Sequence, residues 1–268
     1  MKLPVQSNKA PLCVVQISDC HLGADSGDCL LGMDTDHSLE AVLQSVAADC
    51  PEIDILVASG DLAAHGDASA YQRLAARLKG MAKQVVWLPG NHDSSSLMQS
   101  VVGDQWMPSR LMLDGWQLVF LNSAVPDQVG GFLANDQLAI LAEAGQFDCP
   151  TLVFVHHHLR PVACAWLDEQ QIANADAVFA TIANKDQFKA IICGHVHQQS
   201  EQVFQNIGLL TTPSTCVQFA PNSDDFALDD RNPGYRRFWL GDKGEFQTRV
   251  SRVKGVIFAV DNLARGYE

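Results

Sequence analysis

The stretch Val85-Val-Trp-Leu-Pro-Gly-Asn-His-Asp93 carries the pattern on which this protein is built. Its first four residues are an apolar run of the kind that forms a buried parallel strand. Pro89 and Gly90 end the run abruptly, and an amide, an imidazole and a carboxylate follow in succession. Polar side chains directly after a buried strand are typical of an active site at the carboxyl edge of an α/β sheet. The stretch therefore predicts one strand of such a sheet with site residues at its end.

The same arrangement occurs four more times along the chain. Apolar runs of about strand length cover Leu12 to Ser18, Ile53 to Ser59, Leu152 to Val155 and Ala190 to Cys193. The polar blocks that follow them are Asp19-x-His21, Gly60-Asp61, His156 and Gly194-His195-x-His197. Because parallel strands end at a common edge, we expect all five blocks to converge there. Five of the nine histidines lie in these blocks, and this joint placement predicts a metalloenzyme that holds two metal ions.

Spacing inside the blocks adds detail to this prediction. Asp19 and His21 are two residues apart, so on extended backbone their side chains would point the same way and bind one ion. Gly60 permits a tight turn, and the carboxylate of Asp61 has two oxygens that could bridge neighbouring cations. The run His156 to His158 supplies further imidazoles, and His157 and His158 are as readily explained by packing as by a role beside the metal.

Helices are predicted between the strands. Apolar residues recur with helical spacing from Leu39 to Val46 and from Tyr71 to Leu78. Two further helices are predicted after Asn135 and Asn174, which are suitable N-cap residues. A sixth apolar run, Leu118 to Asn122, predicts another strand of the sheet.

After Gly194 the strands become shorter and are separated by turns, which indicates an antiparallel second half. The expected strands are Gly208 to Thr212, Cys216 to Ala220, Tyr235 to Leu240 and Thr248 to Val253. Asp, Asn and Pro residues make Pro221 to Gly234 a predicted surface loop. We expect a single domain over residues 1–268, in which the part from about residue 208 supplies the later strands and a loop near the site.

Composition limits the partners and the compartment. A net charge of −13 disfavours an extended nucleic-acid partner. The eight cysteines are scattered, which is typical of reduced thiols in the cytosol. Lys2 and Lys9 precede an apolar stretch too short for a signal peptide, and nothing approaches a membrane span. We therefore expect a cytoplasmic protein whose partner is a small molecule, with no membrane association; the oligomeric state stays open.

In order and spacing, the five blocks resemble the motifs of the calcineurin-like metallophosphoesterases, over nearly the whole chain. This resemblance implies a four-layer α/β/β/α sandwich with a mixed central sheet pair and a metal site at the carboxyl ends of the strands. Three segments are more narrowly similar to the bacterial class III 3′,5′-cyclic-AMP phosphodiesterases. They are Trp87 to Asp93, Cys193-Gly-His-Val-His-Gln198 and Thr212-Pro-Ser-Thr-Cys-Val-Gln-Phe219.

Carried over by motif, the resemblance implies two sets of metal ligands that share Asp61. One ion would be held by Asp19, His21, Asp61 and His197, and the other by Asp61, Asn91, His156 and His195. The segment His156-His-His-Leu-Arg-Pro161 departs from the commoner His-His-Pro-Pro form of this motif. We assign His156 as the ligand because it comes first after the strand. Nitrogen and oxygen donors without thiolate fit iron, manganese, zinc or cobalt. The family resemblance favours Fe²⁺ or Mn²⁺.

The resemblance also implies a mechanism in which Asp61 and His92 are the catalytic residues. A bridging water becomes hydroxide between the two ions and attacks phosphorus in line, and His92 protonates the leaving 3′-oxygen. The residues expected to face the substrate are His21, Asp61, Asn91, His92 and His197. The implied reaction is hydrolysis of 3′,5′-cyclic AMP to 5′-AMP.

Three other functions and several weaker site residues stay open from the sequence. A broader phosphodiesterase acting on 2′,3′-cyclic nucleotides or glycerophosphodiesters would share every catalytic residue, a metal-free interaction scaffold could use the same fold, and a nuclease is disfavoured by the charge.

Gly23 to Asp36 is a candidate lid, although a mobile surface connection explains it equally well. Trp166, Phe219 and Tyr235 are candidates for stacking on adenine, with packing the more ordinary explanation. Arg160 could touch phosphate or simply be solvated.

Overall fold

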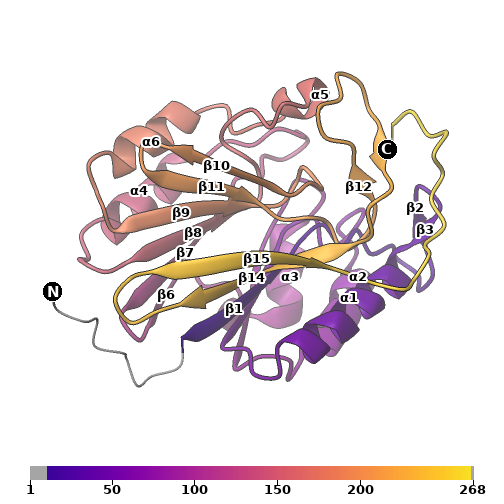
Figure 1. Ribbon diagram of the computed structural model, residues 1–268, viewed down its shortest axis with the longest axis horizontal. Helices are drawn as coiled ribbons and strands as arrows, with labels where there is room; N and C mark the ends of the chain where they lie inside the picture. The colour runs from indigo at the N-terminus through magenta and orange to yellow at the C-terminus, as the bar shows by residue number, and fades with distance from the viewer. Residues whose placement is uncertain (1–10, 267–268) are drawn as a thin grey trace, which may run out of the picture.

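The computed structural model describes residues 11–266, in which two mixed β-sheets face each other and helices cover their outer sides (Figure 1). The predicted fold is confirmed: the order of layers is α/β/β/α. Lys2 and Lys9, which were considered as part of a possible signal peptide, lie outside the described residues. Within the part that the structure describes, no helix is both long and apolar enough to cross a lipid bilayer.

The first sheet has the strand order β15-β14-β1-β4-β5. Its parallel part supplies three of the five polar blocks, because β1, β4 and β5 run in the same direction. The antiparallel strands β14 and β15 complete one side. The bounds are β1 Leu12–Ile17, β4 Ile55–Ser59, β5 Gln84–Leu88, β14 Gly234–Leu240 and β15 Phe246–Arg252.

The second sheet has the order β10-β11-β9-β8-β7-β6 and supplies the other two blocks, which follow β8 and β9. Its four central strands are parallel and both edge strands are antiparallel. The bounds are β6 Arg110–Leu113, β7 Trp116–Leu121, β8 Thr151–Val155, β9 Phe188–Cys193, β10 Ser200–Phe204 and β11 Ile207–Thr211. Two small ribbons lie outside the sheets: β2 Cys29–Leu30 with β3 Met33–Asp34, and β12 Gln218–Phe219 with β13 Leu228–Asp229.

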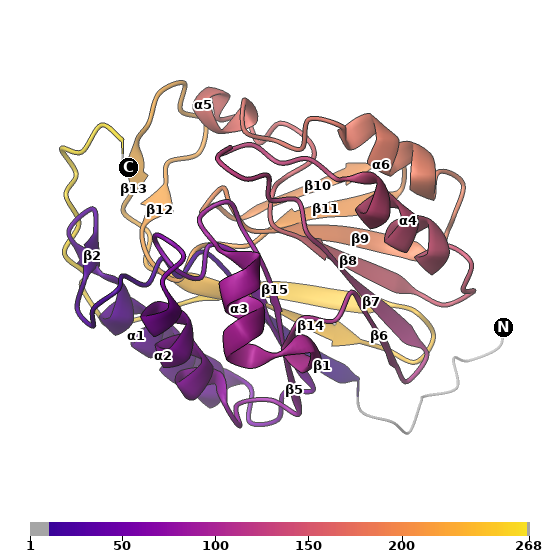
Figure 2. The ribbon, with the colours of Figure 1, turned by 180° about the vertical axis from the view of Figure 1, so that it is seen from behind.

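Helices on the two outer faces complete the sandwich (Figure 2). On the first sheet, α1 and α2 bury an apolar face that includes Leu39, Val42 and Leu74. On the second sheet, α4 and α6 do the same with Leu141 and Phe179. The bounds are α1 Thr35–Asp49, α2 Ala68–Leu78, α3 Ser95–Val102, α4 Asn135–Ala144, α5 Ala165–Asp168 and α6 Ala175–Ile182, with a 3₁₀ turn at Asp104–Trp106.

Several details differ from the predictions. The second half is not wholly antiparallel, because β11 pairs in parallel with β9. The edge strand β10, which precedes β11 in the chain, pairs with it in the antiparallel sense. The predicted strand Cys216 to Ala220 is only the two-residue β12, since this segment bonds to site loops instead. Asn135 is the first helical residue, after the N-cap Ala134. Asn174 is an N-cap, but its side chain bonds to the backbone of Leu133 and not to the helix.

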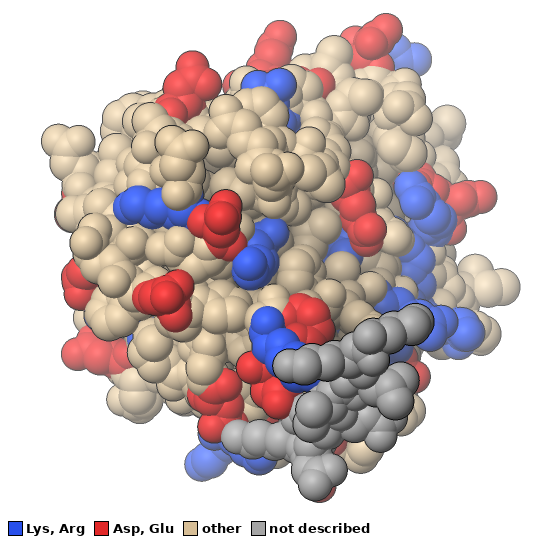
Figure 3. Space-filling model, turned by 60° about the vertical axis from the view of Figure 1, so that its left-hand side comes forward, with Lys and Arg blue, Asp and Glu red and all other residues tan. Residues whose placement is uncertain are grey.

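Charged side chains are distributed without a continuous basic stripe on the face shown in Figure 3, where Lys and Arg lie interspersed with Asp and Glu. Such mixing is compatible with the net charge of −13. A surface of this kind offers little long-range attraction to a nucleic-acid backbone.

The core between the sheets predicts a strong dependence of stability on Phe154. This ring is fully buried, stacks on Phe120 with centroids 5.6 Å apart and meets Phe238 at 5.9 Å. We expect Phe154→Ala to lower the free energy of unfolding by about 3–5 kcal/mol, because a cavity would remain between two rigid sheets. Denaturant unfolding measures this; Val203→Ala on the exposed side of β10 is the control and should change it by less than about 0.5 kcal/mol. Equal losses in the two variants would contradict the assignment of the core.

Candidate metal centre

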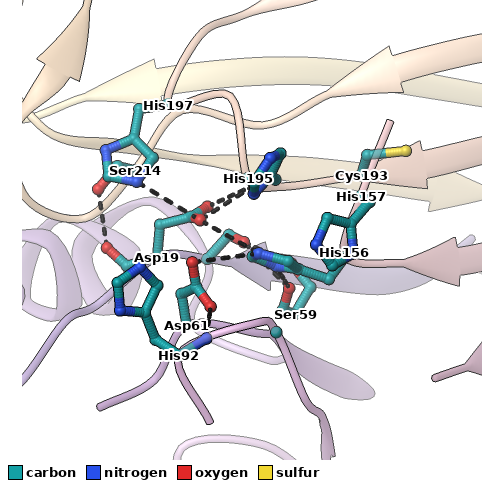
Figure 4. A network of polar contacts seen from close by, with 12 residues as sticks. Asp19, Ser59, Asp61, His92, His156, His157, Cys193, His195, His197 and Ser214 are labelled. Atoms are coloured by element: carbon teal, nitrogen blue, oxygen red, sulfur yellow. Dashed lines mark hydrogen bonds and ion pairs between the residues drawn. The ribbon is translucent and has the colours of Figure 1, made fainter. Parts of the chain in front are cut away.

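The five polar blocks meet where the carboxyl ends of the two sheets adjoin (Figure 4). Asp19 and His21 follow β1, Asp61 follows β4, His156 follows β8, and His195 and His197 follow β9. Their side chains are buried, with Asp19 and His156 fully excluded from solvent. Potential ligand atoms form four overlapping groups, and within each group the atoms lie within 4.8 Å of one another. The groups include all six of these residues together with His92 and His157.

The backbone at these residues is unusual and explains how the side chains converge. Asp19, His21, Asp61, His195 and His197 all have positive φ, between 44° and 65°. Side chains other than glycine rarely adopt this region, and such strain clusters at functional sites. The extended geometry predicted for Asp19 and His21 is therefore wrong, although both do reach one cluster with His197. The strands β1, β4 and β9 thus end in left-handed turns that direct these five side chains into the site.

The first cluster joins Asp19, His21 and His197. The Nε2 atoms of the two histidines are 3.2 Å apart, and Nε2 of His197 is 3.5 Å from Oδ1 of Asp19. Nδ1 of His197 donates to the carbonyl of Val217 at 2.8 Å, which fixes the tautomer and leaves a lone pair on Nε2. Two nitrogen ligands of one tetrahedral ion are about 3.3 Å apart, so the spacing fits a shared cation.

Asp61 lies between the first cluster and His156. Its Oδ2 is 3.7 Å from Nε2 of His21 and 3.2 Å from Nε2 of His156. Nδ1 of His156 donates to the carbonyl of Ser59 at 2.9 Å, so Nε2 is again the nitrogen turned to the carboxylate. Nε2 of His156 is also 4.0 Å from Asp19. One oxygen of Asp61 thus lies within 3.7 Å of a nitrogen of both His21 and His156.

His195 and Asn91 contribute atoms that the protein itself does not satisfy. Nε2 of His195 and Oδ1 of Asn91 are buried and make no hydrogen bond to any residue between 11 and 266. The backbone N–H of His195 donates to both oxygens of Asp19, at 3.0 and 3.1 Å. Buried polar atoms without partners are costly, and a coordinated ion would satisfy them.

The charges at the site also fit cations. Burial lowers the pKa of His197 to about 4 and that of His195 well below its usual value, so both imidazoles are neutral ligands. Burial would lower the pKa of His156 as well, but the carboxylates of Asp61 and Asp19 raise it to about 9. Burial and the neighbouring Asp61 raise the pKa of Asp19 to about 7. The two buried carboxylates stabilise positive charge, as the raised pKa of His156 shows, and the neutral imidazoles of His195 and His197 offer lone pairs, so these residues fit divalent metal ions.

The structure distinguishes the three consecutive histidines. Nε2 of His157 donates to the carbonyl of Val129 at 2.9 Å, and its Nδ1 accepts from the hydroxyl of Ser123 at 2.7 Å. Both nitrogens are therefore occupied within the protein, so His157 supports the site by packing. His158 stacks on His195 with ring centroids 5.8 Å apart. Of the three, His156 alone contacts Asp61, as the sequence assignment expects.

His92 stands beside the cluster at the edge of a cleft. Its backbone N–H donates to Oδ1 of Asp61 at 2.9 Å, and its Nδ1 donates to the carbonyl of Ala64 at 2.9 Å. The cleft has a volume of about 250 Å³. It is lined by His21, Gly23, Ala24, Asp28, Cys29, Leu30, Ala64, His65, Asp67 and His92. A small ligand in this cleft would touch His21 of the buried cluster and His92 together.

Sequence analysis gave no role to Asp93, the last residue of the opening stretch. Its buried carboxylate accepts from the N–H groups of Leu62, Ala63 and Gly90 at 2.9 to 3.2 Å, and from the hydroxyl of Tyr71 at 2.9 Å. These bonds tie the turn that carries Asp61 to the turn that carries Asn91 and His92. Its place in the polar block was the available signal, but its partners are distant in sequence.

The weaker candidates have mostly structural contacts. Tyr235 is buried and donates to Asp49 and the carbonyl of Ser45. Phe219 is also buried, and its ring stacks on that of His197 with centroids 4.2 Å apart. Trp166 packs against Phe219. The guanidinium of Arg160 lies over the ring of Phe204, 4.4 Å from its centroid. The ordinary packing explanations therefore account for these side chains.

The proposed lid, Gly23 to Asp36, forms part of the cleft wall. Arg73 of α2 donates to the carbonyls of Gly23, Ala24 and Asp25, and it also pairs with Asp36. The hydroxyl of Ser69 donates to Ala24 as well. These bonds fix the first part of the loop against α2, which is unlike a freely moving lid.

The family model described as calcineurin-like phosphoesterase matches residues 13–199. The chain is 40% identical over 261 residues to the 3′,5′-cyclic adenosine monophosphate phosphodiesterase CpdA of Pseudomonas aeruginosa, covering 96% of each chain. It is 37% identical to the protein of the same name from Escherichia coli strain K12, covering 100% of this chain and 98% of the relative. Among solved structures, a dimetal phosphatase from Danio rerio superposes with a TM-score of 0.62 at 15% identity, covering 90% of this chain and 99% of that one.

Asp93→Asn tests how far the metal centre depends on the bonds between its turns. The amide cannot accept all four hydrogen bonds because its NH₂ group would face backbone donors. We expect metal affinity to fall by about 10- to 100-fold, as for other residues that orient metal ligands. Titration with Mn²⁺ measures the affinity, and Tyr71→Phe, which removes only one of the bonds to Asp93 together with the acceptor of the Ser94 N–H, should cost less. Unchanged Mn²⁺ affinity in a destabilised Asp93→Asn protein would show a purely structural role.

Proposed function

The chain belongs to the calcineurin-like phosphoesterase family, and from that premise we propose that it hydrolyses 3′,5′-cyclic AMP to 5′-AMP at a dinuclear metal centre. The observation that carries the proposal is the buried cluster of Asp19, Asp61 and histidines beside a small cleft. Relatives at 37–40% identity over nearly the whole chain carry the name of this activity. The spacing of the cluster and its unsatisfied donor atoms support two bound ions.

The proposed ligand sets follow the clusters. One ion would be held by Asp19, His21, Asp61 and His197, and the other by Asp61, Asn91, His156 and His195. We propose Fe²⁺ or Mn²⁺, because the donors are nitrogen and oxygen and the nearest cysteines offer buried, protonated thiols. When bound, such a pair supplies a water of lowered pKa as nucleophile and stabilises charge on the phosphoryl oxygens.

The carboxylates set the charge that the substrate meets. Asp19 and Asp61 would neutralise only part of the charge of two divalent ions, so the site would retain a positive excess. This excess suits a diester with one negative charge and explains how an acidic protein attracts an anion. The remaining surface need not contribute.

His92 is the proposed general acid for the leaving 3′-oxygen. Its Nδ1 is occupied by the carbonyl of Ala64, so proton transfer falls to Nε2. Its backbone bond to Asp61 fixes the ring relative to the bridging carboxylate. We therefore propose that His92 contacts the substrate, together with His21, Asn91 and His197, but does not bind metal.

The eight cysteines are all unpaired in the structure, which supports our proposal of a cytoplasmic location. This is also the compartment in which a cyclic-nucleotide second messenger would be degraded. A scaffold without metals is disfavoured because it would leave the buried carboxylates and the unsatisfied atoms of His195 and Asn91 without a counterpart.

Two substitutions separate acid catalysis from metal binding. His92→Ala should keep the metal content and reduce kcat by about 10²- to 10⁴-fold, because one proton donor is lost. Asp61→Ala should lose both metal and turnover, since both clusters share this carboxylate. Elemental analysis and steady-state kinetics measure the two effects. Equal metal loss in both variants would place His92 among the ligands.

A substrate panel tests the specificity. In one preparation with defined metal, the protein should hydrolyse 3′,5′-cyclic AMP with a higher kcat/KM than 2′,3′-cyclic AMP, glycerophosphodiesters or an aryl diester. Cyclic GMP serves as the matched control for the base. A preference for 2′,3′-cyclic AMP would instead identify a phosphodiesterase of broader specificity. A protein that binds no stoichiometric metal and hydrolyses none of these substrates would be a scaffold.

A further inference from the structure

The faces of the two sheets that pack against each other become polar next to the metal centre. Farther from the site, the side chains of β1 and β4 on this face are the apolar Val14, Ile55 and Val57. Because side chains alternate along a strand, Gln16 lies on the same face as Val14, and Ser59 on the same face as Val57. Both polar side chains are fully buried. An amide and a hydroxyl thus stand where the strand pattern provides for apolar side chains.

The side-chain amide of Gln16 makes hydrogen bonds to both sheets. Its Nε2 donates to Oγ of Ser59 on β4 at 2.8 Å and to the carbonyl of Cys193, the last residue of β9, at 3.3 Å. Its Oε1 accepts from the hydroxyl of Thr212, which follows β11. Both amide hydrogens and the oxygen are therefore used, which gives the buried amide a single orientation.

Two of these partners adjoin proposed metal ligands of the second sheet. The carbonyl of Ser59 accepts from Nδ1 of His156 at 2.9 Å. Cys193 lies two residues before His195, at the end of β9. Ser59 and Cys193 are both drawn beside the cluster in Figure 4. Gln16 of the first sheet is therefore connected to the positions from which His156 and His195 extend.

The strand ends that carry the ligands lie too close together to tolerate a change in their spacing. A Cβ on Gly194 would lie only 1.9 Å from Oγ of Ser18 and 2.7 Å from Oδ2 of Asp19. Each proposed ion takes ligands from both sheets, as Asp19 and His197 do for one of them. A small shift of one sheet against the other would therefore alter the ligand geometry of both ions.

We propose that Gln16 is a positioning residue of the metal centre, whose amide fixes the spacing between the ligand-bearing ends of the two sheets. Apolar contacts hold the sheets together but have no preferred direction, whereas hydrogen bonds have defined lengths and angles. Gln16 acts through Ser59 and Cys193 and does not bind the ions itself. The consequence for metal binding rests on the proposed dinuclear centre.

Gln117 offers a matched control in the same protein. It is also a fully buried glutamine, and its Nε2 donates to the carbonyl of Ala144 and to the hydroxyl of Thr151, both at 3.0 Å. Gln117 and Thr151 lie near the starts of β7 and β8, whereas His156 follows the other end of β8. Replacing either glutamine by leucine removes a buried amide and keeps a side chain of similar size.

Titration with Mn²⁺ compares the variants. Gln16→Leu should weaken Mn²⁺ binding by about 10- to 100-fold, as for other residues that orient metal ligands, and Gln117→Leu should leave it unchanged. Thr212→Val should weaken binding less, because one bond is lost, and Thr212→Ser, which keeps the hydroxyl, should retain the wild-type affinity. Unchanged affinity in Gln16→Leu, or an equal loss in Gln117→Leu, would overturn the proposal.

Backbone hydrogen exchange of the protein as purified, followed by mass spectrometry, tests the positioning without relying on added metal. In Gln16→Leu, the peptide that contains Gly194 to His197 should exchange about tenfold faster than in the wild type, because the N–H of His195 bonds to Asp19 only while the strand ends are held together. Gln117→Leu should exchange there at the wild-type rate. Equal rates in Gln16→Leu and the wild type would refute the role of Gln16. A wild-type protein that binds no Mn²⁺ would instead refute the proposed function, and the exchange rates would still decide whether Gln16 positions the strand ends.

Discussion

The structure depends on two carboxylates, Asp19 and Asp61, that are buried together at the junction of the sheets. Burying like charges in a medium of low polarity is expensive unless a positive charge accompanies them. Around these carboxylates lie the imidazoles of His156 and His197, whose outer nitrogens are held by backbone carbonyls. The inner nitrogens are thereby turned toward the carboxylates, and the whole arrangement becomes favourable when cations enter.

The fold is organised to hold these groups in place before any ion binds. Two sheets supply ligands from opposite sides, so neither sheet alone contains a complete set. Left-handed turns at the ends of β1, β4 and β9 store conformational strain at the site, and hydrogen bonds to the carboxylate of Asp93 tie the turn after β4 to the turn after β5. Gly60 and Gly90 allow the turns to approach, since a Cβ on either would lie within 3 Å of His156 or Asp61. The apolar core between the sheets provides the stability that offsets these local costs.

The sequence by itself determined the parallel strands and the polar residues at their ends, because a buried run followed by polar residues is a local pattern. It also determined that the five polar blocks would meet, because parallel strands end at a common edge. Only the tertiary structure decided that β11 pairs in parallel, that His157 is occupied by Ser123 and Val129, and what Asp93 binds. These outcomes depend on contacts between residues far apart along the chain, and a local pattern carries no information about which distant donor or strand will be adjacent.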